Sequence, residues 1–111
     1  MAEKIKLVQG DTLPSIKLTL TDPTDGAFID VSNVNTVVKV YFRAVGSTEL
    51  LSTLACTNEN DGTDGQVRFD FSGGALNVPA GPYEGEIEIS FNGSLHTVYE
   101  KLKFYVREDF A

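Results

Sequence analysis

The sequence contains one cysteine, one histidine and no tryptophan. A lone cysteine, Cys56, excludes an internal disulfide framework and a zinc site built from cysteines. No apolar run approaches the ~18 residues of a membrane-spanning helix, and the first residues lack the apolar core of a signal peptide. We therefore expect a chain that folds without disulfides and has no membrane partner.

Positive charge is scarce as well. Nine Lys and Arg residues stand against sixteen Asp and Glu residues, so the formal net charge is −7. An excess of negative charge repels phosphate backbones, and no run of basic residues in the sequence offsets it locally. The composition therefore predicts no nucleic-acid partner.

The dominant pattern in the chain is alternation of apolar and polar residues, which is typical of half-buried β-strands. It is clearest at 16–20, at 36–43, where Val38, Val40 and Phe42 share one face, and at 67–71. The segment 50–57 is a weaker strand prediction because its apolar residues fall on both faces, and 28–31 is a short apolar segment. The composition of 58–65 predicts an exposed loop, and 72–82 is irregular.

The last third of the chain predicts a β-hairpin. Ile87, Ile89 and Phe91 alternate with glutamates and serine, and Asn92-Gly93 follows, a pair that favours a type I′ two-residue turn. This register pairs Ile87 with Val98 and Glu84 with Lys101, and it places the even residues 98, 102, 104 and 106 on the buried face.

No stretch of eleven or more residues shows helical apolar spacing. Short strands separated by turn signals predict an all-β fold, either an antiparallel β-sandwich of about 7–8 strands or a small barrel. At 111 residues without a linker or repeat, we expect a single domain over 1–111.

Reactive side chains do not converge in the sequence. His96 is the only possible acid–base relay, and Cys56 has no obvious partner base. Asp61 and Asp64 lie in a glycine-containing loop, but their order does not match a calcium-binding EF-hand. We therefore predict no enzyme, no cofactor and no metal site.

Several large residues fall on the solvent side of their predicted strands. Exposed apolar and tyrosine patches mark protein partners, unless a segment of the same chain covers them. The N-terminal segment 4–8 is either such a cover or a strand that pairs with a neighbouring chain. The candidate partner-binding residues are Ile5, Leu7, Val37, Tyr41, Leu95, Tyr99 and Tyr105.

Two alternatives remain open from the residues alone. The exposed tyrosines would also suit a glycan- or cell-surface-binding module, although such modules usually include tryptophan. Glu84, Glu86 and Glu88 form a stripe along one strand face, and a hydrolase would need a second carboxylate across a cleft. A solubilising role for an exposed stripe is the simpler interpretation.

Several short motifs distributed over nearly the whole chain resemble one family. They are Gln9-Gly10-Asp11-Thr12-Leu13-Pro14-Ser15-Ile16, Leu20-Thr21-Asp22 with Gly26, Ile29-Asp30-Val31-Ser32, Val40-Tyr41-Phe42-Arg43, Asp64-Gly65-Gln66-Val67 and Ala80-Gly81-Pro82-Tyr83-Glu84-Gly85-Glu86. This pattern resembles the N-terminal domain of bacteriophage baseplate upper proteins.

The resemblance implies an immunoglobulin-like β-sandwich that serves as a virion building block. Baseplate upper proteins continue into a stalk and a receptor-binding part, whereas this sequence stops after the last predicted strand. We therefore expect a tail- or baseplate-associated adaptor or a capsid-decorating protein. It would be assembled in the bacterial host cytoplasm and would dock to other phage structural proteins or to copies of itself.

Overall fold

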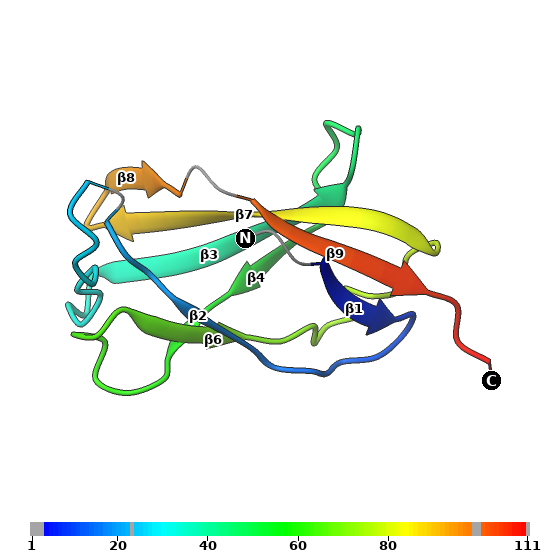
Figure 1. Cartoon of the computed structure of the whole chain (residues 1–111), viewed down its shortest axis with the longest axis horizontal. Coiled ribbons are helices and arrows are strands. Elements are labelled where there is room, and N and C mark those ends of the chain that lie inside the picture. Colours follow the sequence, from blue (N-terminus) through cyan, green and yellow to red (C-terminus); the bar gives the residue numbers. More distant parts are fainter. Residues whose placement is uncertain (1–3, 23, 99–100, 111) are drawn as a thin grey trace.

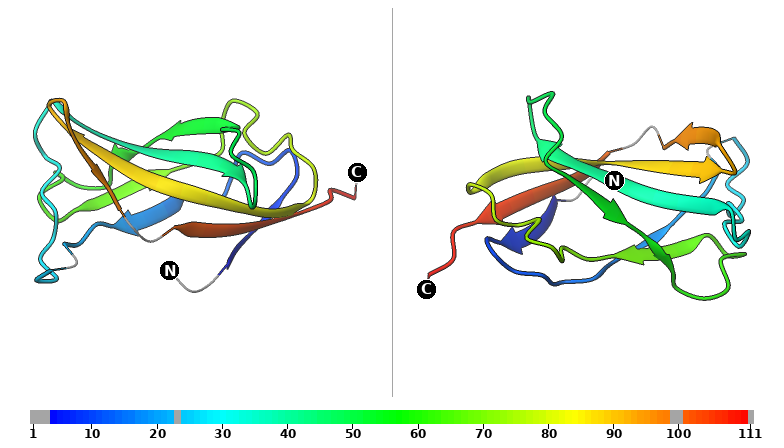
Figure 2. Two further views of the ribbon diagram at one scale, coloured as in Figure 1. Left: turned by 90° about the horizontal axis from the view of Figure 1, so that it is seen from above. Right: turned by 180° about the vertical axis from the view of Figure 1, so that it is seen from behind.

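The chain folds into two β-sheets packed face to face, as the views in Figures 1 and 2 show. This computed structural model describes residues 4–22, 24–98 and 101–110. A six-stranded sheet has the order β1-β9-β7-β3-β4, with β8 also paired to β7, and a three-stranded sheet has the order β2-β6-β5. The strands are β1 Lys4–Val8, β2 Ile16–Thr19, β3 Thr36–Ala44, β4 Ser52–Ala55, β5 Thr57–Asn58, β6 Gln66–Phe69, β7 Gly81–Phe91, β8 Ser94–Thr97 and β9 Leu102–Arg107.

The all-β sandwich is confirmed, with nine strands in the described part of the chain where about 7–8 were predicted. The second strand of the predicted hairpin forms β8 and β9, 28–31 forms no named strand, and 50–57 forms β4 in the larger sheet and β5 in the smaller one. Its apolar residues differ in burial because Leu50 and Leu51 are exposed before β4, whereas Leu54 of β4 is buried. The chain then crosses between the sheets at Cys56, whose N–H donates to the carbonyl of Val38. At 28–31, Phe28 forms an isolated bridge to Thr21, and the N–H groups of Ile29 and Val31 donate to the carbonyls of Leu20 and Gly62.

The core lies between the two sheets and is formed by the alternating residues that the sequence places on one face. Phe42 of β3 is fully buried, with its ring stacked on Tyr83 at 5.1 Å and edge-on to Phe104 at 5.5 Å. The hydroxyl of Tyr83 donates to the carbonyl of Pro79, four residues upstream, and this fixes the start of β7. Such a tyrosine is typical of the corner of immunoglobulin-like sandwiches.

The two-residue hairpin is confirmed. Asn92 and Gly93 both have positive φ, and Ile89 pairs with His96 in the predicted register. The predicted backbone pair Glu84–Lys101 is wrong in register, because Glu84 pairs with Lys103, but the Glu84 and Lys101 side chains do meet, at 3.5 Å. The register shifts by two residues between β8 and β9, and an even shift keeps the same residues on the core face.

The N-terminal segment has a place that neither prediction gave it. It does not cover the outer face, because β1 joins the edge of its own sheet, parallel to β9, and its pairing with a neighbouring chain stays a prediction. Parallel pairing also departs from the all-antiparallel prediction. Leu7 is buried and Ile5 packs against the core, so both side chains face inward. No helix among the described residues is long and apolar enough to cross a membrane.

Candidate functional site: the outer face of the six-stranded sheet

The outer face of the larger sheet holds four of the predicted partner-binding residues. Val37, Leu95 and Tyr105 expose 44%, 66% and 45% of their surfaces, and Tyr41 is partly buried. Ile5 and Leu7 are on the opposite, core side and do not contribute to this face. Tyr99 lies outside the described residues.

These side chains do not form one continuous apolar patch. Along β7, Val37 and Leu95 both flank Ser90, Tyr41 pairs beside Glu86, and Tyr105 pairs beside Pro82. Successive groups are four strand residues apart, which is roughly 13 Å. The glutamates of β7 and the cations of the neighbouring strands lie between them, so these residues form three separate apolar contacts.

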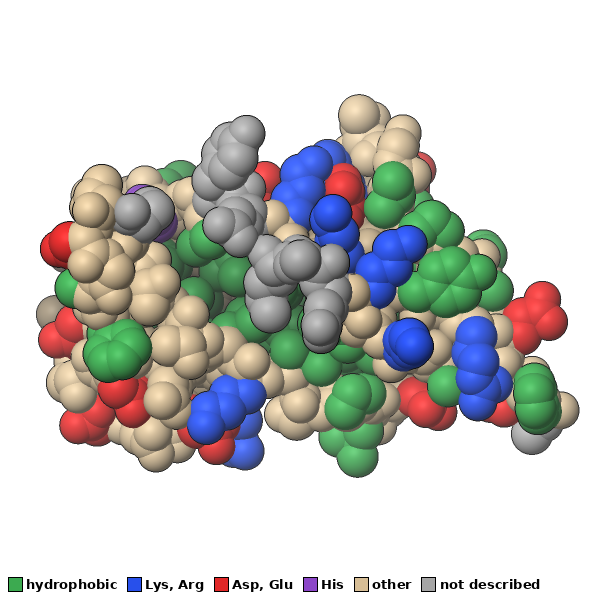
Figure 3. Space-filling model, viewed as in Figure 1, with side chains coloured by type: hydrophobic (Ala, Val, Ile, Leu, Met, Phe, Trp, Pro, Cys, Tyr) green, Lys and Arg blue, Asp and Glu red, His purple; other side chains and the backbone are tan. Residues whose placement is uncertain are grey.

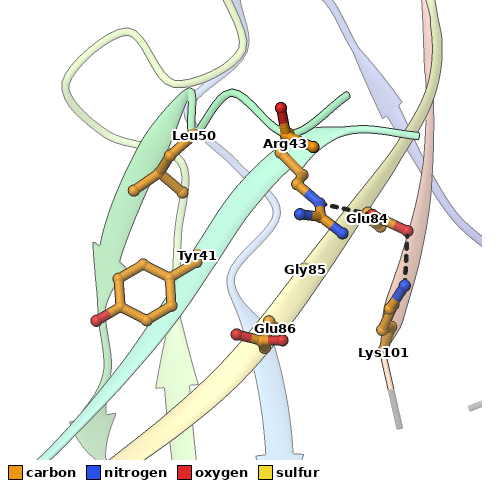
Figure 4. A pocket seen from close by; sticks show the side chains of 8 residues that line it. Tyr41, Arg43, Leu50, Glu84, Gly85, Glu86 and Lys101 are labelled. Carbon is orange, nitrogen blue, oxygen red and sulfur yellow. Dashed lines mark hydrogen bonds and ion pairs between the residues drawn. The ribbon is translucent and has the colours of Figure 1, made fainter. Parts of the chain in front are cut away.

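Two of the glutamates of β7, Glu84 and Glu88, are held by neighbouring side chains. Arg43 Nε lies 2.7 Å from a Glu84 carboxylate oxygen, and Lys101 Nζ lies 3.5 Å from the other (Figure 4). The hydrogen bond from Arg43 and the charge of Lys101 hold the pKa of Glu84 below its usual range. The Tyr41 hydroxyl donates to Glu88 at 2.9 Å, and this bond raises the pKa of Tyr41.

A shallow cavity of about 280 Å³ opens above this network. Figure 4 shows Tyr41 and Leu50 on one side of it and Glu84, Glu86 and Lys101 on the other. The lining therefore combines an aromatic ring and an aliphatic side chain with donors and acceptors. A cavity of this kind suits an anchoring side chain of a partner or one ring of a polar ligand.

The structure assembles a basic surface that the sequence analysis missed. Five of the nine cations lie on β1, on β9 or directly before β9, and Figure 3 shows Lys and Arg side chains across this part of the surface. They come from opposite ends of the chain, so no basic run announced them. The five residues are Lys4, Lys6, Lys101, Lys103 and Arg107.

The remaining candidates for chemistry are separate from one another. His96 is exposed on β8, and burial raises the pKa of the Cys56 thiol to about 12, which disfavours the reactive thiolate. In the loop 58–65, Asp61 accepts hydrogen bonds from Thr63, and Asp64 accepts one from Asn60. Within the described ranges, no three His, Cys, Asp or Glu side chains are grouped to hold a metal ion.

The whole fold has a counterpart among solved structures. The N-terminal domain of phage TP901-1 ORF48 matches this chain with a TM-score of 0.60 and 14% sequence identity, covering 96% of this chain and 85% of that one. At this identity the likeness shows the fold. No protein-family model and no curated protein matches the chain.

Proposed function

We propose that this chain is a non-enzymatic structural component of a bacteriophage virion, which docks to other phage structural proteins through the outer face of its six-stranded sheet. One observation carries the proposal, the likeness of nearly the whole chain to a domain of a phage protein. The sequence motifs resemble a phage structural domain independently. The tail or baseplate, where it would act as an adaptor, is the proposed position, with capsid decoration as the other position.

The distribution of side chains supports docking in place of catalysis. The exposed apolar residues Val37 and Leu95 stand apart from a cavity in which Glu84 already pairs with Arg43 and Lys101. Protein interfaces are centred on apolar side chains within a polar rim, so Val37 and Leu95 are the proposed centre of docking. Assembly would take place in the host cytoplasm, and the protein would remain on the particle.

Quantitative mass spectrometry of purified virions tests the proposal. We expect this polypeptide at a fixed ratio to the other structural proteins, and its absence from particles would contradict the proposal. A Val37→Asp/Leu95→Asp variant should fold but fail to join particles. Val34→Asp is the matched control, because Val34 is 94% exposed in the loop before β3 and lies outside the proposed interface.

The cavity favours a second function, binding of a glycan. Tyr41 and Leu50 offer an apolar surface to a sugar ring, and Arg43 and Glu86 offer a donor and an acceptor to its hydroxyls. A glycan array read with the wild-type chain and with Tyr41→Ala tests this function. Binding that disappears in the variant, and persists in a Tyr105→Ala control, would support it, whereas an array without binding would contradict it.

A further inference from the structure

β1 forms one edge of the six-stranded sheet, and part of its backbone faces away from β9 (Figure 1). The N–H of Gln9 donates to the carbonyl of Arg107 at 3.0 Å, so the backbone groups of Gln9 point toward β9. Backbone N–H and carbonyl groups point to alternate edges along a strand, so those of Lys6 and Val8 point away from β9. Consistently, the Val8 carbonyl accepts the N–H of Asp11 at 3.2 Å on the outward side. The N–H and carbonyl of Lys6 and the N–H of Val8 thus form an open hydrogen-bonding edge.

The side chains next to this edge are cations that form no ion pair with a carboxylate of residues 4–22, 24–98 or 101–110. Lys4 pairs directly across from Lys103, and Val8 pairs across from Arg107. Lys4 contacts the ring of Tyr105 at 5.8 Å, and Arg107 donates to the carbonyl of Glu108. Across the part of the chain that the structure describes, none of Lys4, Lys6, Lys103 and Arg107 is ion-paired with a carboxylate.

The like charges that face each other across β1 and β9 do not stabilise the fold. Like charges directly opposite each other across two strands are unfavourable, and Lys4 and Lys103 are such a pair. The chain as a whole carries a net charge of −7, but this part of its surface is positive. An anionic partner would therefore be attracted here, and its charge would relieve the repulsion between the lysines. Lysines on an edge also repel basic strands, so they select against the wrong partner as well.

The opposite side of β1 is apolar, since Leu7 is buried and Ile5 is partly buried against the core. A strand added beyond β1 would therefore lie beside Lys4 and Lys6 on the outer face of the sheet. On the inner face it would lie beside Ile5. We propose that the β1 edge binds an extended segment of a partner protein in which acidic and apolar residues alternate, as one further strand of the sheet. This inference goes beyond the virion role and stands on the fold and its charges alone.

An acidic protein segment fits this surface better than a nucleic acid does. Open backbone donors and acceptors at strand spacing pair with another polypeptide backbone, and a phosphate chain has no equivalent groups. The apolar inner side also requires the partner to present an apolar side chain at every second residue, which a nucleic acid lacks. A nucleic acid would need cations alone, so its binding is an outcome that the experiment can detect.

The test titrates the full chain with a synthetic peptide of alternating Glu and Val and follows amide hydrogen exchange. We expect saturable binding that weakens with added salt and slows exchange of the Lys6 and Val8 amides. A peptide of the same composition, with its Glu and Val residues in two blocks, is the first control. A single-stranded oligonucleotide is the second.

Two variants separate the charge from the edge. Lys4→Glu/Lys6→Glu should weaken binding at least about tenfold, and Lys17→Glu/Arg68→Glu, a cross-strand cation pair on the other sheet, should leave it unchanged. Lys6→Pro removes the outward N–H and should abolish protection at Val8 while circular dichroism and the thermal melt confirm the fold.

Three results would overturn the inference. They are the absence of saturable binding at about 1 mM alternating peptide, equal binding of the block peptide or the oligonucleotide, and binding that leaves the Lys6 and Val8 amides unprotected. None of these results bears on whether the chain is found in virions, so the two proposals fail separately.

Discussion

The two sides of the six-stranded sheet have opposite characters. On the inner side, Val40, Phe42, Ile89 and Phe104 are fully buried, and the described residues include no buried polar or charged residue. On the outer side, charges dominate; they are paired around Glu84, whereas the cations of β1 and β9 form no ion pair within the described part of the chain. The contrast indicates that stability comes from the inner side, which leaves the outer side free to carry recognition.

Phe42→Ala should have the largest effect on stability. The ring of Phe42 contacts Tyr83, Phe71 and Phe104, so its removal leaves a cavity at the centre of the core. We expect the free energy of unfolding, measured by urea denaturation, to fall by about 3–5 kcal/mol. Phe28→Ala, at an exposed phenylalanine, should change it by less than about 0.5 kcal/mol.

Gly85→Ala should have the next largest effect. A Cβ at this position would lie 2.9 Å from Phe104 Cε2 and 3.0 Å from Val40 Cγ1, which is too close in a packed core. We expect destabilisation of about 1–3 kcal/mol in the same urea measurement. In a Val40→Ala background the added methyl should be tolerated better, and strictly additive effects would contradict this explanation.

Glu84→Gln tests the paired part of the outer side. It removes the acceptor of Arg43 and Lys101 and should lower the free energy of unfolding by about 1 kcal/mol at neutral pH. Because folding lowers the pKa of Glu84 from its ordinary 4.5, its contribution is present above that pH and is lost as the pH falls through the folded value. Wild-type and variant stabilities should therefore converge in acid, and a constant difference would contradict the ion-pair explanation.

Lys4→Glu/Lys6→Glu, in the unpaired part, should have the smallest effect on stability. The variant removes a like-charge contact with Lys103, so the thermal melt should stay level or rise slightly, within about 0.5 kcal/mol. A large loss of stability would mean that these lysines support the fold, and the contrast between the two sides would then fail at β1.

Local patterns predicted much of the fold. The alternation in β3 and β7 identified the buried residues, and Asn92-Gly93 predicted the turn and the first pairs of the hairpin correctly. The prediction failed at Lys101, because a register shift farther along β9 leaves no signal in the turn. It also failed at β1, whose five residues carry no information about which edge they join.

The candidate site was only partly predictable for the same reason. Val37, Tyr41, Leu95 and Tyr105 were assigned to the outer face because side-chain direction follows from period two along each strand. Their separation into three contacts depends on which residues of β7 lie between them. Those residues are set by the register in which β3, β8 and β9 pair with β7. The cavity at Tyr41 and Leu50 likewise forms where the β3–β4 connection meets β7.

Which residues face the core is therefore written into short stretches of the chain, since a strand turns successive side chains to opposite sides whatever its neighbours are. Which charges meet is a different matter, because it depends on pairing between distant segments. Lys4 and Lys6 meet Lys103 and Arg107 only because the first strand lies parallel to the last, and a basic surface thereby forms on an acidic protein.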